Sequence, residues 1–363
     1  MEIIFCNKSD NKEYLRFIKS IYNNFPNYKD SWSPVLKEFL EQKGSFCRNL
    51  TIEPIMVKQD SRIVATCIYI QSSRDPEVLQ IAFFEALEGH QSAVDLILEK
   101  AKEIALNRCL NKIIIGLNGH VNYGIGFLCD KFNGDISFGS SFSPPYYVDY
   151  FLKYKPLQHK MVSYNGNVNS LNFDAEKGIL DRINKKFNYR KLDFKNFRRD
   201  MEIYTDLNNI CFKNHPLYFQ RTNSEDYELF KELRYFISEE NIIFVQCGDT
   251  PIGYMLWYPD FNELMSAGET IGVKAFIKNK LFAKRIKKFK IVEIAIHPQF
   301  QKSGAILGLF NECYKRALHR YTSYESSWIF ETNFKSKNFG VKWAENEYKH
   351  YVAFEIPLQE NIL

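Results

Sequence analysis

The stretch that decides the fold runs Val292-Glu-Ile-Ala-Ile-His-Pro-Gln-Phe-Gln-Lys-Ser-Gly-Ala-Ile-Leu-Gly-Leu-Phe-Asn311. Its β-branched start predicts a strand, His297-Pro298 marks a turn, and apolar residues after Gly304 recur at the spacing of an amphipathic helix. A helix begins with unpaired backbone N–H groups and the positive end of its dipole. Because the strand turns directly into the helix, both are directed at one point, which predicts an anion site suited to phosphate groups.

The elements around this stretch follow an order that also occurs earlier in the chain. In the second half we expect strands at 242–246, 252–258, 290–296 and 327–331, with a turn at 248–251 and a helix at about 304–321. In the first half we expect a hairpin at 53–71, a strand at 79–86, a helix at 91–107 and a strand at 111–117. The order predicts an α/β (α+β) protein with two copies of one fold, each a mixed, largely antiparallel sheet flanked by helices.

The length and one polar segment predict the domain boundaries. At 363 residues the chain is longer than a single hydrophobic core normally supports, so two domains are expected. Residues 164–188 are rich in Asn, Gly, Lys and Arg, as in an exposed connection that leads into a short helix. We therefore predict a first domain at 1–163, a linker at 164–185 and a second domain at 186–363.

The composition is that of an ordinary globular protein, with 45% hydrophobic and 25% charged residues. A net charge of +5 is too small for a nucleic-acid-binding domain and suits an anionic small molecule. The eight cysteines include no C-x-x-C pair and no Cys/His set at zinc spacing, so we expect reduced thiols and no metal site. The N-terminus does not read as a secretion signal and no apolar run reaches bilayer-spanning length, which predicts a cytoplasmic protein without a transmembrane segment.

Two motifs resemble those of the GNAT superfamily of N-acetyltransferases. Residues 301–306, Gln-Lys-Ser-Gly-Ala-Ile, resemble its acetyl-CoA loop, in which Q/R-x-x-G-x-G/A follows a strand. Residues 328–336, Trp-Ile-Phe-Glu-Thr-Asn-Phe-Lys-Ser, resemble its second motif, a strand that ends in Asn before a helix, and a final strand is expected at 351–356. The phrases at 139–147, 257–262 and 325–333 further resemble an uncharacterised bacterial group of tandem double-GNAT-fold proteins.

The resemblance implies an N-acyltransferase that uses acetyl-CoA or another acyl-CoA and acts on a small-molecule or peptide amine. It implies that the strand edge at Ile294, Ala295 and Ile296 pairs with pantetheine, together with Asn333 and Ser336. It also implies that the pyrophosphate binds the loop residues, which are Gln301, Lys302, Ser303, Gly304, Ala305 and Ile306. The family usually has Gly or Ala at the position of Ile306. A homodimer is one option, and the sequence leaves the oligomeric state open.

The catalytic groups are assigned on the same resemblance. Glu293 matches the strand carboxylate that acts as the base in several GNAT enzymes, and Glu331 is an alternative base. The family's Tyr acid would fall at Gly340, so Tyr348 or Tyr351 replaces it, or solvent protonates the thiolate, or the domain does not catalyse. The rival hypothesis is therefore a ligand-binding or scaffold protein that retains the fold. Acyl transfer from charged tRNA is a third alternative, which the modest charge does not favour.

The first half lacks the loop motif. Its corresponding segment at 85–91 has two carboxylates and no Q-x-x-G, and carboxylates repel a pyrophosphate. We expect this half to have lost CoA binding and to form a scaffold or one wall of the acceptor cleft. The residues expected to line that wall are Asn118, His120, Asn122, Tyr146 and Tyr147. The basic run at 278–290 is either a solvated face, a lid over the CoA site or a surface that contacts a membrane.

Overall fold

The computed structural model describes residues 1–358, in which the strands of both halves join one mixed sheet. The strands of the first half are β1 (Glu2–Phe5), β2 (Leu50–Gln59), β3 (Arg62–Ser72), β4 (Asp75–Ala86), β5 (Lys112–Ile115), β6 (Phe127–Leu128) and β7 (Leu157–Asn167). Those of the second half are β8 (Asn188–Lys191), β9 (Ile242–Cys247), β10 (Thr250–Pro259), β11 (Lys288–Ile296), β12 (Ser323–Ser326), β13 (Ile329–Phe330) and β14 (Asn346–Pro357).

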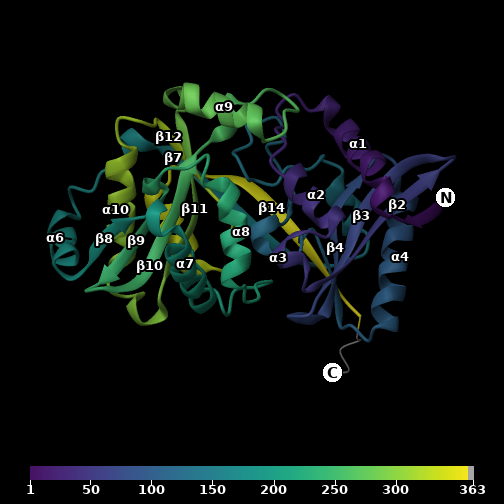
Figure 1. The fold of residues 1–363 in the computed structure, drawn as a ribbon, viewed down its shortest axis with the longest axis horizontal. Helices are drawn as coiled ribbons and strands as arrows, with labels where there is room; N and C mark the ends of the chain where they lie inside the picture. The colour runs from purple at the N-terminus through teal and green to yellow at the C-terminus, as the bar shows by residue number, and fades with distance from the viewer. Residues whose placement is uncertain (359–363) are drawn as a thin grey trace.

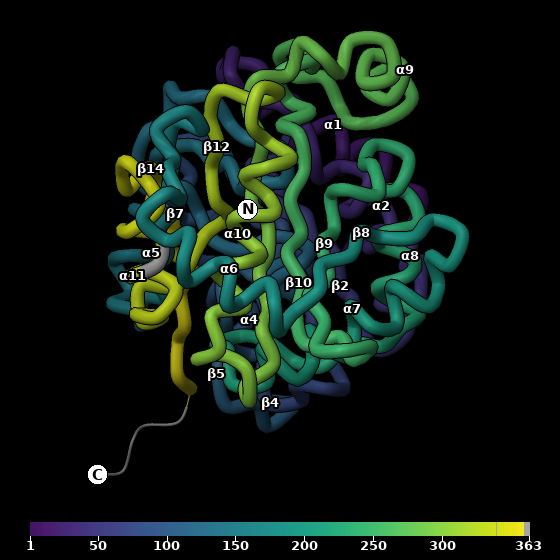
Figure 2. The backbone as a smooth tube through the Cα atoms, turned by 90° about the vertical axis from the view of Figure 1, so that its left-hand side faces the viewer, coloured from purple at the N-terminus to yellow at the C-terminus, as the bar shows by residue number. Residues whose placement is uncertain are grey.

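Helices cover the sheet along its whole length. The α-helices are α1 (Asn11–Ile21), α2 (Ser33–Glu41), α3 (Gly44–Cys47), α4 (Gln91–Asn107), α5 (Tyr147–Leu152), α6 (Lys177–Lys186), α7 (Phe197–Cys211), α8 (Asn223–Leu233), α9 (Val273–Phe282), α10 (Ala305–Ala317) and α11 (Phe334–Trp343). Helix α4 packs on β3, β4 and β5, and α10 packs on β9, β10 and β11. Helix α9 lies at the top of both views (Figures 1 and 2). No helix within residues 1–358 is long and apolar enough to cross a bilayer.

The strand order confirms the predicted repeat. From one edge it reads β1-β2-β3-β4-β5-β14, and from the other edge it reads β8-β9-β10-β11-β12-β7. In both series the neighbours are antiparallel except for one parallel pair, which is β4 with β5 in the first half and β11 with β12 in the second. The same connections therefore occur twice, and the two copies lie side by side (Figure 1).

The halves exchange their last strands. The final strand β14 pairs with β5, with Phe354 opposite Ile115, and it also pairs with β7. In turn β7 pairs with β12, with Gly166 opposite Tyr324. Figure 1 shows β14 crossing between the halves. The exchange was not expected from the sequence, whereas the ranges 1–163, 164–185 and 186–363 stay predictions. The predicted linker holds the end of β7 and most of α6.

Apolar periodicity explains why these segments form these elements. On α4 the predicted core positions Val94, Ile97 and Ala101 are fully buried, at the spacing that places them on one helix face. The β-branched run of β5, Ile113 to Ile115, is buried on both faces of the sheet, as expected for a strand that lies between a parallel and an antiparallel neighbour. Burial of these side chains stabilises the sheet at its centre, where both halves contribute strands.

Because β14 is part of the sheet of the first half, removing a buried side chain from β14 should destabilise that half. Phe354 is fully buried and its ring lies 6.2 Å from that of Phe127 and 5.9 Å from that of Phe151. We expect Phe354→Ala to lower the free energy of unfolding by about 3–5 kcal/mol. The same substitution should increase the rate of amide hydrogen exchange in peptides from residues 112–128. Leu106→Ala, at a residue that is 62% exposed, is the control and should change little. An effect confined to peptides after residue 186 would contradict the role of β14 in the first half.

Candidate functional site

The second half opens where its parallel strands part. Strands β11 and β12 pair only from Lys288–Ser323 to Ile291–Ser326. The next amide, that of Ser327, still donates to the carbonyl of Ile291 at 2.7 Å, and then the chain leaves to form β13, which pairs with β7. Residues 293–296 of β11 therefore pair with β10 on one side, while the described strands leave their other edge unpaired. Of the strand predicted at 327–331 only Ile329–Phe330 form a strand (β13), and the strand that pairs with β11 lies earlier, at Ser323–Ser326 (β12).

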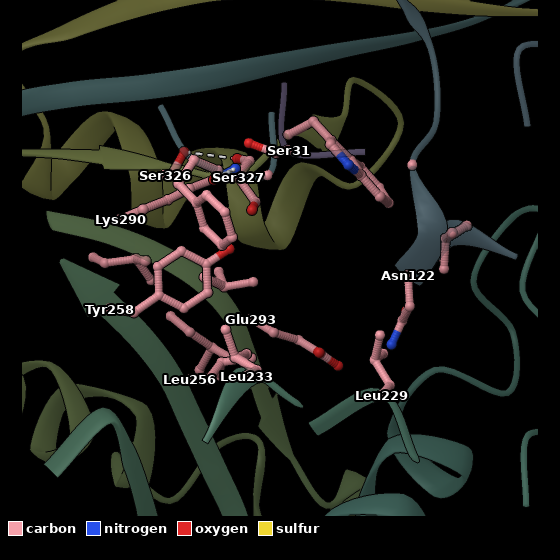
Figure 3. Close-up of a pocket in the computed structure, with 18 of the residues that line it drawn as sticks. Ser31, Asn122, Leu229, Leu233, Leu256, Tyr258, Lys290, Glu293, Ser326 and Ser327 are labelled. Carbon is pink, nitrogen blue, oxygen red and sulfur yellow. Dashed lines mark hydrogen bonds between the residues drawn. The ribbon is translucent and has the colours of Figure 1, made fainter. Parts of the chain in front are cut away.

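A bulge in β11 sets which side chains face this opening. The register with β10 shifts between Leu256, which pairs with Glu293, and Trp257, which pairs with Ile291. Val292 is the extra residue, and one extra residue reverses the alternation of side chains along a strand. Lys290 and Glu293 are three residues apart and would face opposite sides of a regular strand. Both line the same cavity (Figure 3).

The cavity has a volume of about 930 Å³ and lies between the halves. Its wall includes Trp32, Asn122, Phe138 and Tyr164 from the first half and Tyr204, His215, Tyr258, Glu293, Ile306, Phe310, Trp328, Asn333, Ser336 and Trp343 from the second. Helix α9 adds Val273 and Phe276. Most of these side chains are apolar or aromatic and a few polar groups converge among them, which is the usual character of a small-molecule site.

Glu293 is an acidic residue of the cavity wall whose carboxylate accepts hydrogen bonds from three side chains. The hydroxyl of Tyr204 donates to its Oε2 at 2.6 Å and the hydroxyl of Tyr254 donates to its Oε1 at 2.5 Å, while the Nδ2 of Asn208 also donates to Oε1. Burial raises the pKa of Glu293 above its ordinary value, although these bonds and the charge of Arg221 oppose the rise. Figure 3 shows its carboxylate pointing into the cavity. A fixed carboxylate with a raised pKa is suited to accept a proton.

The loop before α10 has the predicted strand-to-helix geometry. A single 3-10 turn at Pro298–Phe300 follows β11, and Gly304 adopts a left-handed conformation with φ of 83° directly before α10. The hydroxyl of Ser303 accepts from the amide of Ala305 at 3.3 Å. Within the described residues no hydrogen bond is found for the amides of Lys302, Gly304 and Ile306. These three N–H groups near a helix N-terminus fit an anionic phosphate group.

The two candidate CoA motifs meet in space. Lys335 Nζ lies 3.3 Å from the Oε1 of Gln301, which places the start of α11 beside the loop. The side chain of Asn333 accepts from the amide of Ser336 at 3.2 Å, and both residues line the cavity. Ile294 and Ile306 also line it, whereas Ala295 and Ile296 belong to the core beneath. The side chain of Ile306 thus forms part of the cavity wall.

The other catalytic candidates lie elsewhere. Glu331 follows β13, where its amide donates to the carbonyl of Lys160 at 2.9 Å, and it is not part of the cavity wall that the described residues form. Tyr351 is 3% exposed and packs in the core of the central strands. Tyr348 lies under the ammonium group of Lys349, 4.4 Å from the ring centroid, and neither Tyr lines the cavity within the described part of the chain. The catalytic roles of these three residues stay predictions.

Gly340 has a structural explanation. A Cβ atom at this position would lie 2.9 Å from the ring of Tyr164, which comes from the exchanged strand β7. The Tyr164 ring lines the cavity and its hydroxyl donates to Glu347 at 3.2 Å. Burial raises the pKa of Tyr164 to about 12. The space beside Gly340 is therefore filled by an aromatic ring from the other half.

The residues expected from the first half are mostly structural. Asn122 lines the cavity, but Asn118 accepts from the amide of Phe83 at 2.7 Å, and His120 is fully buried with its Nε2 3.0 Å from the carbonyl of Phe219. Tyr147 donates to Glu85 at 2.6 Å and Tyr146 to the carbonyl of Ala86 at 3.1 Å. Glu85 lies near the end of β4, within the strand predicted at 79–86, and burial raises its pKa to about 8.

The basic run is divided among several elements. Residues 278–290 contain the end of α9, a 3-10 turn at 283–285 and the start of β11. Leu281 is 69% exposed, whereas Ile286 and Phe289 are buried. Because Val273 and Phe276 of α9 line the cavity, this helix lies against the candidate site. Sequence reasoning missed Lys290 as a site residue because it read this residue as part of a surface run.

Comparisons with known proteins agree with this geometry. A tandem GNAT protein from the clavulanic acid biosynthesis pathway superposes with a TM-score of 0.56 at 8% identity, over 99% of both chains. A probable N-acyltransferase from Enterococcus faecalis gives 0.55 at 8% identity, over 98% of this chain and 72% of the other. A GCN5-related N-acetyltransferase from Sphaerobacter thermophilus gives 0.50 at 10% identity, over 99% and 96%. The chain has a tandem GNAT fold.

Among curated proteins, the chain is similar to Protein YghO of Escherichia coli K12. The two are 21% identical over 378 residues, which cover 97% of this chain and 94% of that protein. No family profile matches the chain. Within residues 1–358 no group of three or more His, Cys, Asp or Glu residues is arranged to hold a metal ion.

The raised pKa of Glu293 predicts a pH dependence of stability. The unfolded chain releases this proton near the ordinary value of 4.5, whereas the folded chain holds it to higher pH. Ionisation therefore favours unfolding between the two pKa values, and the stability of the wild type relative to Glu293→Gln should fall as pH rises through this interval. Urea unfolding of both proteins at about pH 4, 6 and 8 measures the difference.

Glu239→Gln provides a control of opposite sign. A hydrogen bond from Lys191 lowers the pKa of Glu239, so this carboxylate stabilises the folded chain above the ordinary pKa and loses that effect as pH falls. The free energy of unfolding of the wild type should therefore increase relative to that of Glu239→Gln as pH rises. If the free energy of unfolding of the wild type also increases relative to that of Glu293→Gln with rising pH, the environment described for Glu293 is wrong.

Proposed function

We propose that this chain is an acyl-CoA-dependent N-acyltransferase that transfers an acetyl or other acyl group to an amine. One observation carries the proposal. Glu293, the edge of β11 and the start of α11 border a single cavity, and the amides around the start of α10 that have no hydrogen bond within the described chain lie next to it. The fold likeness supports the same class, since the compared structures include N-acetyltransferases.

The residues present fit an acyl-CoA ligand. The amides of Lys302, Gly304 and Ile306 are assigned to the pyrophosphate and the edge at Ile294 to the amide groups of pantetheine. Asn333 and Ser336 face the same stretch of the cavity from α11. Gln301, Ser303, Ala305, Ala295 and Ile296 hold the loop and the strand in place. Acyl-CoA supplies an activated thioester, and the amine reaches it through the cavity between the halves.

Glu293 is the proposed general base. It takes the proton of the acceptor ammonium, so that the neutral amine attacks the carbonyl. The hydroxyls of Tyr204 and Tyr254 fix its two carboxylate oxygens, which removes rotational freedom from the base. No side chain is assigned to the protonation of the leaving thiolate, because the Tyr164 hydroxyl is engaged with Glu347 and Tyr348 and Tyr351 lie off the cavity wall of the described chain. Solvent protonates the thiolate.

A ligand-binding protein without catalysis is the second candidate. The observation that favours it is the Tyr164 ring packed against Gly340. The GNAT resemblance implies that a Tyr at the position of Gly340 is the acid of many members of that superfamily. The second candidate would bind acyl-CoA without turnover. The cytoplasmic location, the domain ranges and a small-molecule or peptide amine as the acceptor remain predictions.

Replacement of Glu293 tests catalysis. Because a positioned base contributes about 10²–10⁴-fold, Glu293→Gln should lower kcat/KM by about 100-fold or more while acetyl-CoA still binds. Release of free thiol in the presence of a panel of amines measures the rate. In the wild type kcat/KM should decline as pH falls below the raised pKa of Glu293, since protonation removes the base. Glu331→Gln is the matched control, and equal losses in both variants would contradict the assignment.

Replacement of Gly304 tests acyl-CoA binding. A side chain there meets both the positive φ of 83° and the Cδ1 of Ile183, 2.7 Å from an added Cβ. Strain of about 1–3 kcal/mol should displace the loop, so Gly304→Val should weaken acetyl-CoA binding roughly 10- to 100-fold by calorimetry. Gly248→Val carries a similar positive φ of 59° with open space around it, in the turn between β9 and β10, and should retain binding. Binding without thiol release would select the second candidate.

A further inference from the structure

Lys290 is a buried cation whose described partners are neutral. Its residue is 2% exposed, and its Nζ donates to the hydroxyl of Ser140 at 2.8 Å and to the carbonyl of Phe138 at 3.2 Å. An ammonium group has three N–H donors. The side chain also lines the cavity that contains Glu293 (Figure 3).

The nearby carboxylates are engaged with other lysines. Lys288 Nζ lies 3.0 Å from Asp260 and 3.6 Å from Glu325, and Lys349 Nζ lies 3.7 Å from Glu325. The hydroxyl of Ser137 also donates to Glu325, at 2.5 Å. Three ammonium groups thus share two carboxylates, and among the described residues no ion pair of Lys290 is found.

Burial of an unpaired ammonium is costly. Burial lowers the pKa of Lys290 to about 8, although Glu325 and Asp260 raise it, while Lys349 and Lys288 lower it further. An anion in the cavity would pair with the ammonium form and remove this cost. Ser326 and Tyr258, which both carry a hydroxyl group, also line the cavity near Lys290 (Figure 3).

The first half supplies an internal comparison. Lys290 pairs with Glu325 in the parallel ladder, and in the first half the same ladder position pairs Gln80 with Ile114. The Gln80 amide is neutral and satisfied, since its Nε2 donates to the carbonyl of Gly119 at 3.1 Å and its Oε1 accepts from the amide of Gly119 at 2.8 Å. A neutral side chain whose nitrogen and oxygen each have a partner therefore suffices for this position of the fold. The fold itself therefore does not require the positive charge of Lys290 at the equivalent position of the second half.

We propose that Lys290 binds a carboxylate of the substrate, carried either by the amine acceptor or by the far end of the acyl group. The substrate classes rest on the acyltransferase proposed above. Lys290 and Glu293 are three residues apart on one strand, which places their Cα atoms about 10 Å apart at most. A short substrate can therefore contact the ammonium group with its carboxylate while its reacting atoms lie near the base.

Binding measurements test this without requiring turnover. By calorimetry we compare succinyl-CoA with butyryl-CoA, and N-acetylglycine with N-acetylglycinamide, because each pair differs chiefly by one carboxylate. The wild type should prefer one carboxylate ligand over its neutral partner by about 10- to 100-fold, as expected for a charge-assisted hydrogen bond. The CoA pair reports a carboxylate on the acyl group, and the glycine pair reports one on the acceptor.

Lys290→Met should abolish the preference, and Lys290→Arg should retain most of it because the charge remains. Lys287→Met is the matched control, since it removes one positive charge at an exposed residue just before the same strand. Circular dichroism establishes that each variant is folded. Equal binding of both members of each pair by the wild type would overturn the proposal, and so would a preference that survives in Lys290→Met.

The outcome is separable from that of the proposed function. Thiol release from the same acyl-CoA esters reports acyl transfer, whereas the preference for a carboxylate is read from binding. A Lys290-dependent preference without thiol release would support carboxylate recognition and reject the transferase. Thiol release without any such preference would do the opposite.

Discussion

The separation of β11 from β12 is the constraint on which the candidate site depends. Parallel pairing ends at Ile291 and Ser326, and the hydrogen bond from the Ser327 amide to Ile291 is the last between the two segments. Beyond it β11 keeps its pairing with β10, so one edge of the strand is left with unpaired backbone groups. Unpaired backbone groups inside a protein require a partner. A ligand with amide groups of its own can supply that partner, which is why a break in a sheet serves as a binding edge.

The second half cannot form this opening alone. Strand β7, from the first half, pairs with β12, which stays paired with β11, and then with β13, which it holds away from β11. The segment at 135–140 contributes in a second way, because Ser137, Phe138 and Ser140 bond to the buried charges of Glu325, Asp260 and Lys290. Breaking a buried network of this kind is strongly destabilising because it leaves uncompensated charge. The junction of the halves is therefore both a structural core and a wall of the cavity.

Local features of the fold could be predicted from the sequence, and non-local ones could not. The strand, turn and helix at 292–311 follow from β-branched residues, Pro298 and Gly304, all of which act within a few residues. The exchange of β7 and β14 depends on pairing between segments far apart in the sequence, Phe354 with Ile115 and Gly166 with Tyr324, and such pairing leaves no periodicity in either strand. Glu293 was found by its position in a motif. Its partners Tyr204 and Asn208 come from α7, where they read as ordinary helix residues.

The two halves share a backbone plan and differ in the side chains at the opening. The parallel ladders align Ile81 with Ile291, and the amide of Gly116 donates to Ile81 at 3.2 Å as that of Ser327 does to Ile291. Two residues after this aligned pair, Glu293 of the second half corresponds to Phe83 of the first. Phe83 is 8% exposed and packs in an aromatic cluster.

Phe83 explains why the first half has no equivalent site. Its ring centroid lies 5.0 Å from that of Phe39, and its amide is taken up by the side chain of Asn118. The carboxylate of this strand, Glu85, lies two residues further on and is enclosed by the hydroxyls of Tyr22 and Tyr147. The opening of the first half is thus closed by apolar side chains and its acid is enclosed, so the repeated backbone geometry is not sufficient for a site. The two halves differ in the side chains at the end of the parallel ladder and just beyond it: among the described residues, the second half has Lys290 and Glu293 on the cavity wall where the first half has Gln80 and Phe83.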